Sequence, residues 1–160
     1  MISVKTDPNL DIVLDRVVDV SPELLWKAWT EPKHLMPWFC PAPWKVTACE
    51  IDLQPGGTFK TMMEGPAGEK QPVEGCYLEI VPYQRLSWTD SMTGGFRPKA
   101  PSSLAFTAII SFDKKGPGTR YLVQALHASA EMKSGHEKMG FLDGWGKALD
   151  QLVAYCKQMG

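Results

Sequence analysis

The sequence predicts an α+β fold in which a curved antiparallel sheet of about six or seven strands wraps round one long C-terminal helix. Three observations predict it. An alternating strand pattern is followed by two short helices, the middle of the chain consists of strands separated by Gly- and Pro-containing turns, and the last residues carry an apolar stripe with helical spacing. The length of 160 residues suits a single domain spanning residues 1–160.

The first strand and the two short helices follow from local patterns. In residues 10–20 apolar side chains alternate with aspartates, which is the period of a half-buried strand. Ser21 can cap a helix and Pro22 fits its first position. The packing face of this helix is then formed by Leu25, Trp26, Ala28 and Trp29. A second short helix follows Pro32, and we expect Pro37 to end it.

The middle of the chain reads as a series of strands. The predicted strands are residues 45–53, 58–64, 73–81, 85–90, 104–113 and 119–127. The breaks between most of them are short and contain Gly or Pro, which favours tight turns between antiparallel neighbours. The segment 91–103 is longer and rich in Gly, Pro and Ser, so we expect a mobile loop there.

The last element is predicted as one amphipathic helix over about residues 134–157. Its apolar side chains recur at spacings of three and four, at Met139, Leu142, Trp145, Leu149, Leu152, Val153 and Cys156. Gly140, Gly144 and Gly146 are unfavourable inside a helix, by about 1 kcal/mol each relative to Ala. Their presence suggests that this helix closely approaches the sheet or something bound beneath it.

Composition excludes several classes of protein. The formal net charge is −1 and Lys and Arg are scattered, which does not suit a phosphate-binding face, so we expect no nucleic-acid partner. No run approaches the roughly 18 apolar residues of a membrane span, so we expect no membrane partner. The first residues lack the apolar core of a signal peptide, which predicts a cytoplasmic protein.

No motif for catalysis or metal binding is present. The four cysteines form no CxxC pair, and neither HExxH nor GxSxG occurs, so we predict no catalytic residue, no metal site and no cofactor. We expect reduced thiols, with Cys76 and Cys156 as small buried apolar residues. Glu74 and Glu79 fall on opposite faces of one strand, so at most one carboxylate of this pair faces inward. An inward carboxylate among aromatic rings would have a raised pKa and could be an acid or a ligand anchor.

Six segments in a fixed order carry a resemblance to a known family. They are VSPELLWKAWTEP (20–32), PWFCP (37–41), LQPGGTF (53–59), GPAG (65–68), GCYLEIVPYQRL (75–86) and GWGKALDQL (144–152). Together they resemble the AHSA-type domains, the branch of the START-like (SRPBCC) superfamily related to the activator of the ninety-kilodalton heat-shock protein ATPase. The resemblance covers about residues 10–155. It departs at Phe39-Cys40-Pro41, where many relatives carry a second Trp and a Gly, and in the long loop 91–103.

The resemblance implies a helix-grip fold with an apolar cavity between the sheet and the long helix. This chain has suitable side chains for such a cavity, and we expect its lining to comprise Trp38, Phe59, Met62, Tyr77, Trp88, Phe106, His127, Met139, Leu142 and Trp145. The function predicted in this way is the binding of a small hydrophobic or amphipathic ligand. A densely packed core without a cavity is the alternative. The segment between Trp38 and Trp44 could form a lid over the cavity or a packed cap on the end of the sheet.

Two other functions remain open at this stage. An enzyme of the polyketide-cyclase or lyase kind would need an acid–base pair in the cavity, such as His127 with Glu74 or Tyr77. A partner module of the heat-shock chaperone is suggested by the relatives that give the family its name. A homodimer formed through sheet edges is a further option.

Overall fold

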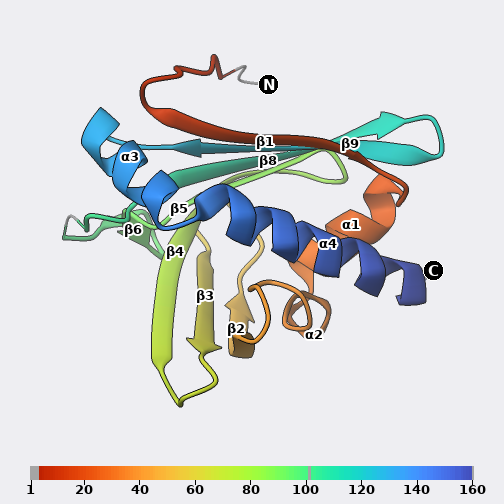
Figure 1. The fold of residues 1–160 in the computed structure, drawn as a ribbon, viewed down its shortest axis with the longest axis horizontal. Coiled ribbons are helices and arrows are strands. Elements are labelled where there is room, and N and C mark those ends of the chain that lie inside the picture. The colour runs from red at the N-terminus through yellow and green to blue at the C-terminus, as the bar shows by residue number, and fades with distance from the viewer. Residues whose placement is uncertain (1–3, 101, 160) are drawn as a thin grey trace.

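The computed structural model describes residues 4–100 and 102–159 and contains one large antiparallel sheet (Figure 1). The N-terminal residues 1–3, on which part of the signal-peptide prediction rests, and Pro101 of the predicted loop lie outside the described residues. The sheet order is β1-β9-β8-β5-β4-β3-β2. The strands are β1 Asp11–Val18, β2 Lys45–Ile51, β3 Thr58–Glu64, β4 Lys70–Val81, β5 Arg85–Thr89, β8 Thr107–Lys115 and β9 Gly118–Leu126. The predicted α+β class and antiparallel sheet are confirmed.

Two short helices, α1 (Pro22–Thr30) and α2 (Pro32–Leu35), connect β1 to β2. As predicted, Ser21 caps α1, and its Oγ accepts a hydrogen bond from the Leu24 backbone N at 3.3 Å. The buried side chains of α1 include all four residues of the predicted packing face. These residues fix α1 against the sheet and bring Trp29 into the core.

The sheet is strongly curved. Figure 1 shows β1, β8 and β9 running across the molecule, whereas β2, β3 and β4 run nearly at right angles to them. Register shifts in β2, between Val46 and Ala48, and in β4, between Tyr77 and Glu79, contribute to this curvature because a bulge bends its strand. The long helix α4 (Phe141–Met159) crosses the concave side diagonally, which is the arrangement of a helix-grip fold (Figure 1).

The segment predicted as a mobile loop contains a small hairpin of β6 (Met92–Thr93) and β7 (Arg97–Pro98). Its turn includes Gly95 with φ +79°, and the Gly95 N donates to the Gly56 carbonyl at 2.7 Å. A Gly-Gly pair between two short extended stretches is a hairpin signal that the prediction of a loop did not use.

The prediction of one uninterrupted C-terminal helix is wrong. The chain forms α3 (Ala130–Lys138) and then α4, with Met139 and Gly140 between them. Gly140 has φ +88°, a conformation that commonly ends a helix and that side-chain-bearing residues rarely adopt. A Cβ at Gly146 would lie 3.1 Å from an Arg16 guanidinium nitrogen. At this glycine, α4 therefore closely approaches a side chain of β1, as we expected for the glycines.

We expect Gly140→Ala to lower the free energy of unfolding by roughly 1–2 kcal/mol, because Ala is strained at positive φ. The matched control is Gly135→Ala in α3, where the added methyl has open space and no positive φ. That substitution is expected to leave stability unchanged or raise it by up to about 1 kcal/mol. Urea denaturation of both variants measures the difference. Equal effects of the two substitutions would contradict the assignment of Gly140 as the helix end.

Candidate functional site

Seven aromatic side chains pack together between the concave side of the sheet and α4. We call them the aromatic cluster, and they are Trp29, Trp38, Phe39, Phe59, Tyr77, Trp88 and Trp145. They come from α1, the segment after α2, strands β3, β4 and β5, and α4. The cluster therefore connects most of the elements that the fold brings together.

Trp29 lies at the centre of the aromatic cluster and is 0% exposed. Its ring centroid lies 4.9 Å from that of Trp38 and 5.3 Å from that of Trp88. The indole Nε1 donates a hydrogen bond to the Tyr121 hydroxyl on β9 at 3.1 Å. The buried polar atoms of Trp29 and Tyr121 thus satisfy each other, as buried polar groups generally must.

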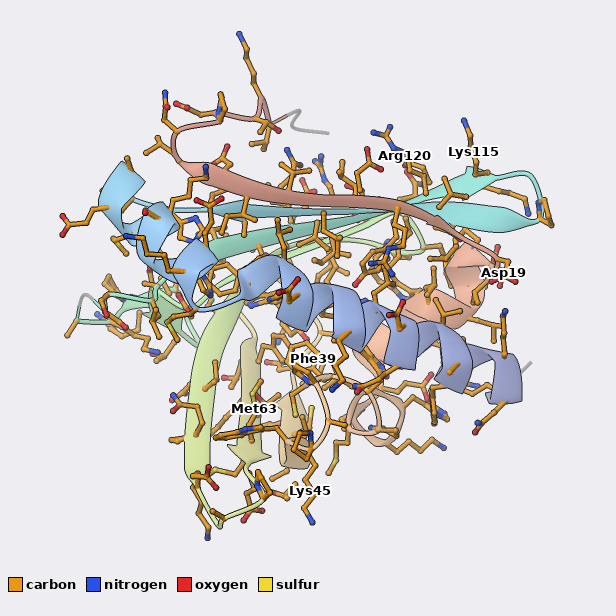
Figure 2. All side chains as sticks on the ribbon, in the orientation of Figure 1. Asp19, Phe39, Lys45, Met63, Lys115 and Arg120 are labelled. Atoms are coloured by element: carbon orange, nitrogen blue, oxygen red, sulfur yellow. The ribbon has the colours of Figure 1, made fainter. Side chains whose placement is uncertain are left out.

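Phe39 covers the cluster from the side of the segment that follows α2. It is half-buried, and its ring centroid lies 5.6 Å from that of Phe59. Figure 2 shows Phe39 next to α4, on the side facing β2 and β3. Gln151 of α4 holds this segment: its Nε2 donates to the carbonyls of Trp38 at 3.0 Å and Cys40 at 2.8 Å, and its Oε1 accepts from Ala42 N at 2.9 Å.

Tyr77 forms the deep end of the cluster. Its ring stacks on Phe59 with centroids 5.2 Å apart and planes 12° apart, and the residue is 0% exposed. Its hydroxyl has no hydrogen-bond partner among the described residues. Burial, and secondarily the nearby Cys49, raise the pKa of Tyr77 far above its ordinary value, so the hydroxyl keeps its proton. A buried polar group without a partner costs about 1–3 kcal/mol.

The structure brings together half of the predicted cavity residues. Those in the aromatic cluster are Trp38, Phe59, Tyr77, Trp88 and Trp145. Met62 differs, because strict alternation along β3 places it on the face of exposed Lys60, opposite to Phe59. Met63 shares the face of Phe59 instead, at the end of β3 that extends beyond α4 (Figure 2).

Met139 and Leu142 also lie away from the cluster. They are 66% and 44% exposed, because the helix break at Gly140 changes the direction of the chain between them. The expectation that they line an interior cavity assumed an unbroken helix, and that assumption is wrong. Trp29 and Phe39 take part in the cluster although the sequence did not mark them as lining residues. Their positions on an apolar helix face and next to Trp38 were the available signals.

The remaining two predicted residues, Phe106 and His127, line an open cleft beside the cluster. This cleft has a volume of about 290 Å³, and we call it the Phe106 cleft; its lining residues are Ser91, Ala105, Phe106, Thr107, Leu126, His127, Ala128 and Met132. The Phe106 ring lies 6.3 Å from Trp145, centroid to centroid, which connects the cleft to the aromatic cluster.

His127 and His136 form a hydrogen-bonded pair at the side of this cleft. The His127 Nδ1 lies 3.0 Å from the Leu10 carbonyl oxygen, which can only accept, so Nδ1 carries the proton. The His127 Nε2 then accepts from the His136 Nδ1 at 2.9 Å. Burial, and secondarily His127, lower the pKa of His136. The pair joins the end of β9 to α3, a helix without any fully buried side chain.

One carboxylate near the cleft has a raised pKa, as we expected for an acidic side chain that faces inward. It is Asp90, whose pKa is raised chiefly by burial, and its Oδ1 accepts from the Phe106 backbone N at 2.8 Å. Glu79, one of the two carboxylates named from the sequence, does not have this role, because it pairs with Arg85 on the neighbouring strand. Asp90 was not among the carboxylates named from the sequence, although it ended a predicted strand; in the structure it follows β5 directly.

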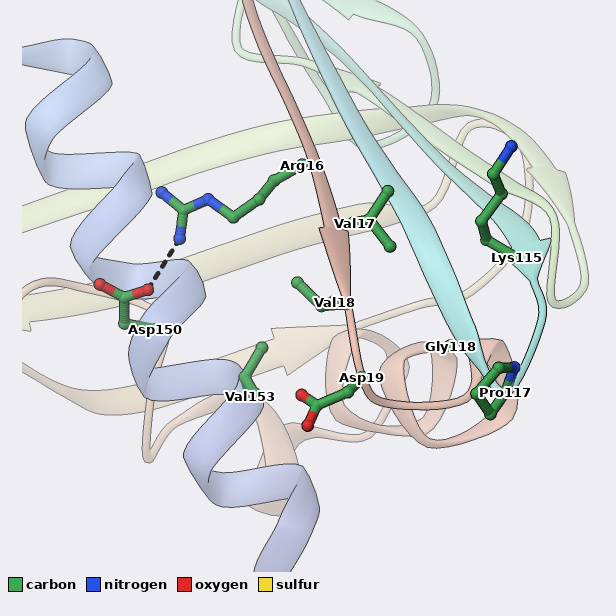
Figure 3. A pocket seen from close by; sticks show the side chains of 9 residues that line it. All are labelled: Arg16, Val17, Val18, Asp19, Lys115, Pro117, Gly118, Asp150 and Val153. Carbon is green, nitrogen blue, oxygen red and sulfur yellow. Dashed lines mark hydrogen bonds and ion pairs between the residues drawn. The ribbon is translucent and has the colours of Figure 1, made fainter.

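A second open groove, of about 450 Å³, lies between β1, the β8–β9 hairpin and α4 (Figure 3). Its acidic groups are already paired. Arg16 bonds to Asp150 at 2.7 Å, and Asp19 bonds to Lys157 at 2.8 Å. Exposed pairs of this kind contribute little to stability, and they leave neither aspartate of the groove free to bind a ligand. Neither this groove nor the Phe106 cleft is lined by Tyr77 or Phe59.

The described residues offer little other chemistry. No three His, Cys, Asp or Glu side chains come together there as metal ligands. Burial raises the pKa of Cys40 and of Cys49 to about 11, so these thiols stay protonated near neutral pH. Cys76 and Cys156 are fully buried, as predicted. Within the same part of the chain, no helix is long and apolar enough to cross a membrane.

The lowered pKa of His136 predicts an acid-sensitive contribution to stability. The unfolded state binds the proton more readily than the folded state, so this contribution is complete above the unfolded pKa of about 6.5 and declines as pH falls below it. We expect the Tm of the wild type to fall more steeply between pH 7.5 and 5.5 than that of His136→Phe, which retains the ring packing on Phe106 and Phe141. Asp90 is present in both proteins, so its contribution to the pH dependence of the Tm is the same in both. Parallel curves would contradict a role for His136.

Comparison with known proteins agrees with the fold. The family model described as "Activator of Hsp90 ATPase homolog 1-like protein" matches residues 19–157. A crystal structure of a protein from Nitrosomonas europaea is 40% identical, covers 96% of this chain and 98% of its own, and has a TM-score of 0.93. A protein from Mycobacterium smegmatis is 25% identical over 96% of this chain and 94% of its own, with a TM-score of 0.77.

An AHSA1-like protein from Aeromonas hydrophila, solved by NMR, is 20% identical over 94% of both chains, with a TM-score of 0.68, and supports the fold alone. None of the curated proteins compared matches this chain. The family match covers most of the sequence and the fold is the helix-grip arrangement, so the resemblance inferred from the six segments is confirmed. This chain belongs to the family of Activator of Hsp90 ATPase homolog 1-like proteins.

Proposed function

We propose that this protein binds a small, largely apolar molecule in the aromatic cluster between the sheet and α4. The observation that carries the proposal is the gathering of seven aromatic rings from six parts of the chain around one interior region. Aromatic rings offer large contact area to a flat or apolar ligand, and small-molecule sites are usually lined by such side chains.

The position of the half-buried rings also supports binding at this place. Phe39 and Trp145 lie at the surface end of the cluster, whereas Phe59 and Trp88 lie behind them and are buried. A ligand reaches the inner rings when one of the outer rings turns aside. Rotation of a half-buried side chain is a small motion compared with movement of α4, which Gln151 and the core residues hold in place.

The enzymatic alternative has less support from the geometry. It required His127 to pair with Glu74 or Tyr77, whereas the ring nitrogens of His127 contact Leu10 and His136. The Tyr77 hydroxyl has no hydrogen-bond partner among the described residues, so it does not pair with His127. We therefore propose binding, without a chemical step, as the function of the aromatic cluster.

We expect Trp145→Leu to weaken the binding of the fluorescent apolar compound N-phenyl-1-naphthylamine roughly tenfold. Each aromatic contact is worth about 0.5–1.5 kcal/mol beyond burial, and 1.4 kcal/mol corresponds to a factor of ten. The matched control is Leu142→Ala on the same helix, whose side chain is exposed and outside the cluster. Fluorescence titration measures both, with circular dichroism to verify folding. Absence of saturable binding to the wild type, or equal losses in both variants, would contradict the proposal.

A further inference from the structure

Two tyrosines of this protein are buried to the same degree but differ in their hydrogen bonds. Tyr77 is 0% exposed and Tyr121 is 2% exposed. The Tyr121 hydroxyl accepts a hydrogen bond from the Trp29 Nε1 at 3.1 Å. The Tyr77 hydroxyl lies in the same apolar core without a partner among the described residues. Most buried polar side-chain atoms in folded proteins have a partner, so this hydroxyl calls for an explanation.

We propose that the Tyr77 hydroxyl is the hydrogen-bond donor for an uncharged carbonyl oxygen at the buried end of the ligand. This inference rests on the proposed function, because it assigns a ligand class to the same aromatic cluster. Tyr77 stacks on Phe59, and Phe59 packs at right angles on Trp88 with ring centroids 5.1 Å apart. The Tyr77 hydroxyl is thus a buried donor carried by a ring that packs within the aromatic cluster.

The proton of the Tyr77 hydroxyl can be paired only by an acceptor. A phenol can donate one hydrogen bond, and the buried Tyr77 keeps its proton at all physiological pH values. Ketone, ester and amide oxygens accept such a bond without carrying a proton of their own. A purely apolar ligand would leave the hydroxyl unpaired, so binding would gain nothing from Tyr77.

The charges around the cluster exclude an anion at this end. The buried polar residues within the described chain are Asp11, Thr61, Ser87, Thr89, Thr119, Gln124 and His127, and no Lys or Arg is among them. His127 is committed to Leu10 and His136 at the cleft. A carboxylate placed beside Tyr77 would lack a counter-charge in an apolar environment, which is strongly unfavourable. The predicted ligand class is therefore an aromatic or other flat apolar compound that carries a neutral carbonyl group.

Three naphthalene compounds of similar shape test this assignment. They are 2-acetylnaphthalene, which has the carbonyl, 2-isopropenylnaphthalene, in which a CH₂ group replaces the oxygen, and 2-naphthoate, which is anionic. We expect the wild type to bind the ketone about tenfold more tightly than the alkene, and both more tightly than naphthoate. Tyr77→Phe should bind ketone and alkene equally. Competition against N-phenyl-1-naphthylamine or isothermal titration measures the affinities.

The outcomes separate this inference from the proposed function. If the alkene binds but the wild type shows no preference for the ketone, or Tyr77→Phe retains the preference, the assignment of Tyr77 is overturned while binding to the cluster stands. Tightest binding of naphthoate overturns the neutral ligand class. If none of the three compounds and no N-phenyl-1-naphthylamine binds, both proposals fail.

Thermal stability of the ligand-free protein provides a second readout. Tyr77→Phe removes a hydroxyl that has no partner in the described part of the chain, so we expect an unchanged or higher Tm. Tyr121→Phe is the matched control, because it leaves the buried Trp29 N–H unpaired and is expected to lower the Tm. A Tm loss in Tyr77→Phe as large as that in Tyr121→Phe would mean that the hydroxyl is already satisfied in the free protein. That result would overturn its assignment as a ligand donor.

Discussion

Packing around Trp29 is the constraint on which the rest of the structure depends. This fully buried side chain of α1 contacts Trp38 and Phe39 after α2, Trp88 on β5 and Trp145 on α4, and its N–H bonds to Tyr121 on β9. Large aromatic side chains contribute much of the burial energy of a core, and their fixed shapes leave few alternative arrangements. One residue therefore fixes α1, the following segment, the sheet and α4 relative to one another.

The segment that carries Phe39 illustrates how polar contacts complement this packing. Gln151 bonds to the backbone at Trp38, Cys40 and Ala42, which holds the segment against α4 and leaves the Phe39 ring half-buried over Phe59. Backbone groups are satisfied there, while the ring packs on Trp29, Trp38 and Phe59 without being fully buried. The result is a firmly held covering segment with one aromatic side chain at its surface. The Tyr77 hydroxyl has no partner among the described residues, which is an exception to the usual rule that buried polar groups are paired.

The fold was predictable from the sequence because its signals are local. Alternation marked the strands, Ser21 and Pro22 marked the start of α1, and turn residues marked the antiparallel connections. The helix break at Gly140 was missed because the spacing of the apolar residues stays helical on both sides of it. The backbone itself leaves the helical conformation there. Tyr77 and Trp88 were named as lining residues because the family resemblance implies an apolar cavity and aromatic side chains suit its lining. Contacts between segments far apart in the sequence, such as that of Gln151 with the Trp38 carbonyl, depend on tertiary packing that no local pattern contains.

The central claim is that a buried phenol donates to the carbonyl group of a ligand within the aromatic cluster. The carbonyl stretching band of bound 2-acetylnaphthalene, recorded by infrared difference spectroscopy, tests it most directly, since hydrogen bonding lowers the frequency of this band. The account predicts a lower frequency in the wild type than in Tyr77→Phe, with Tyr121→Phe resembling the wild type. The same frequency in wild type and Tyr77→Phe would contradict it.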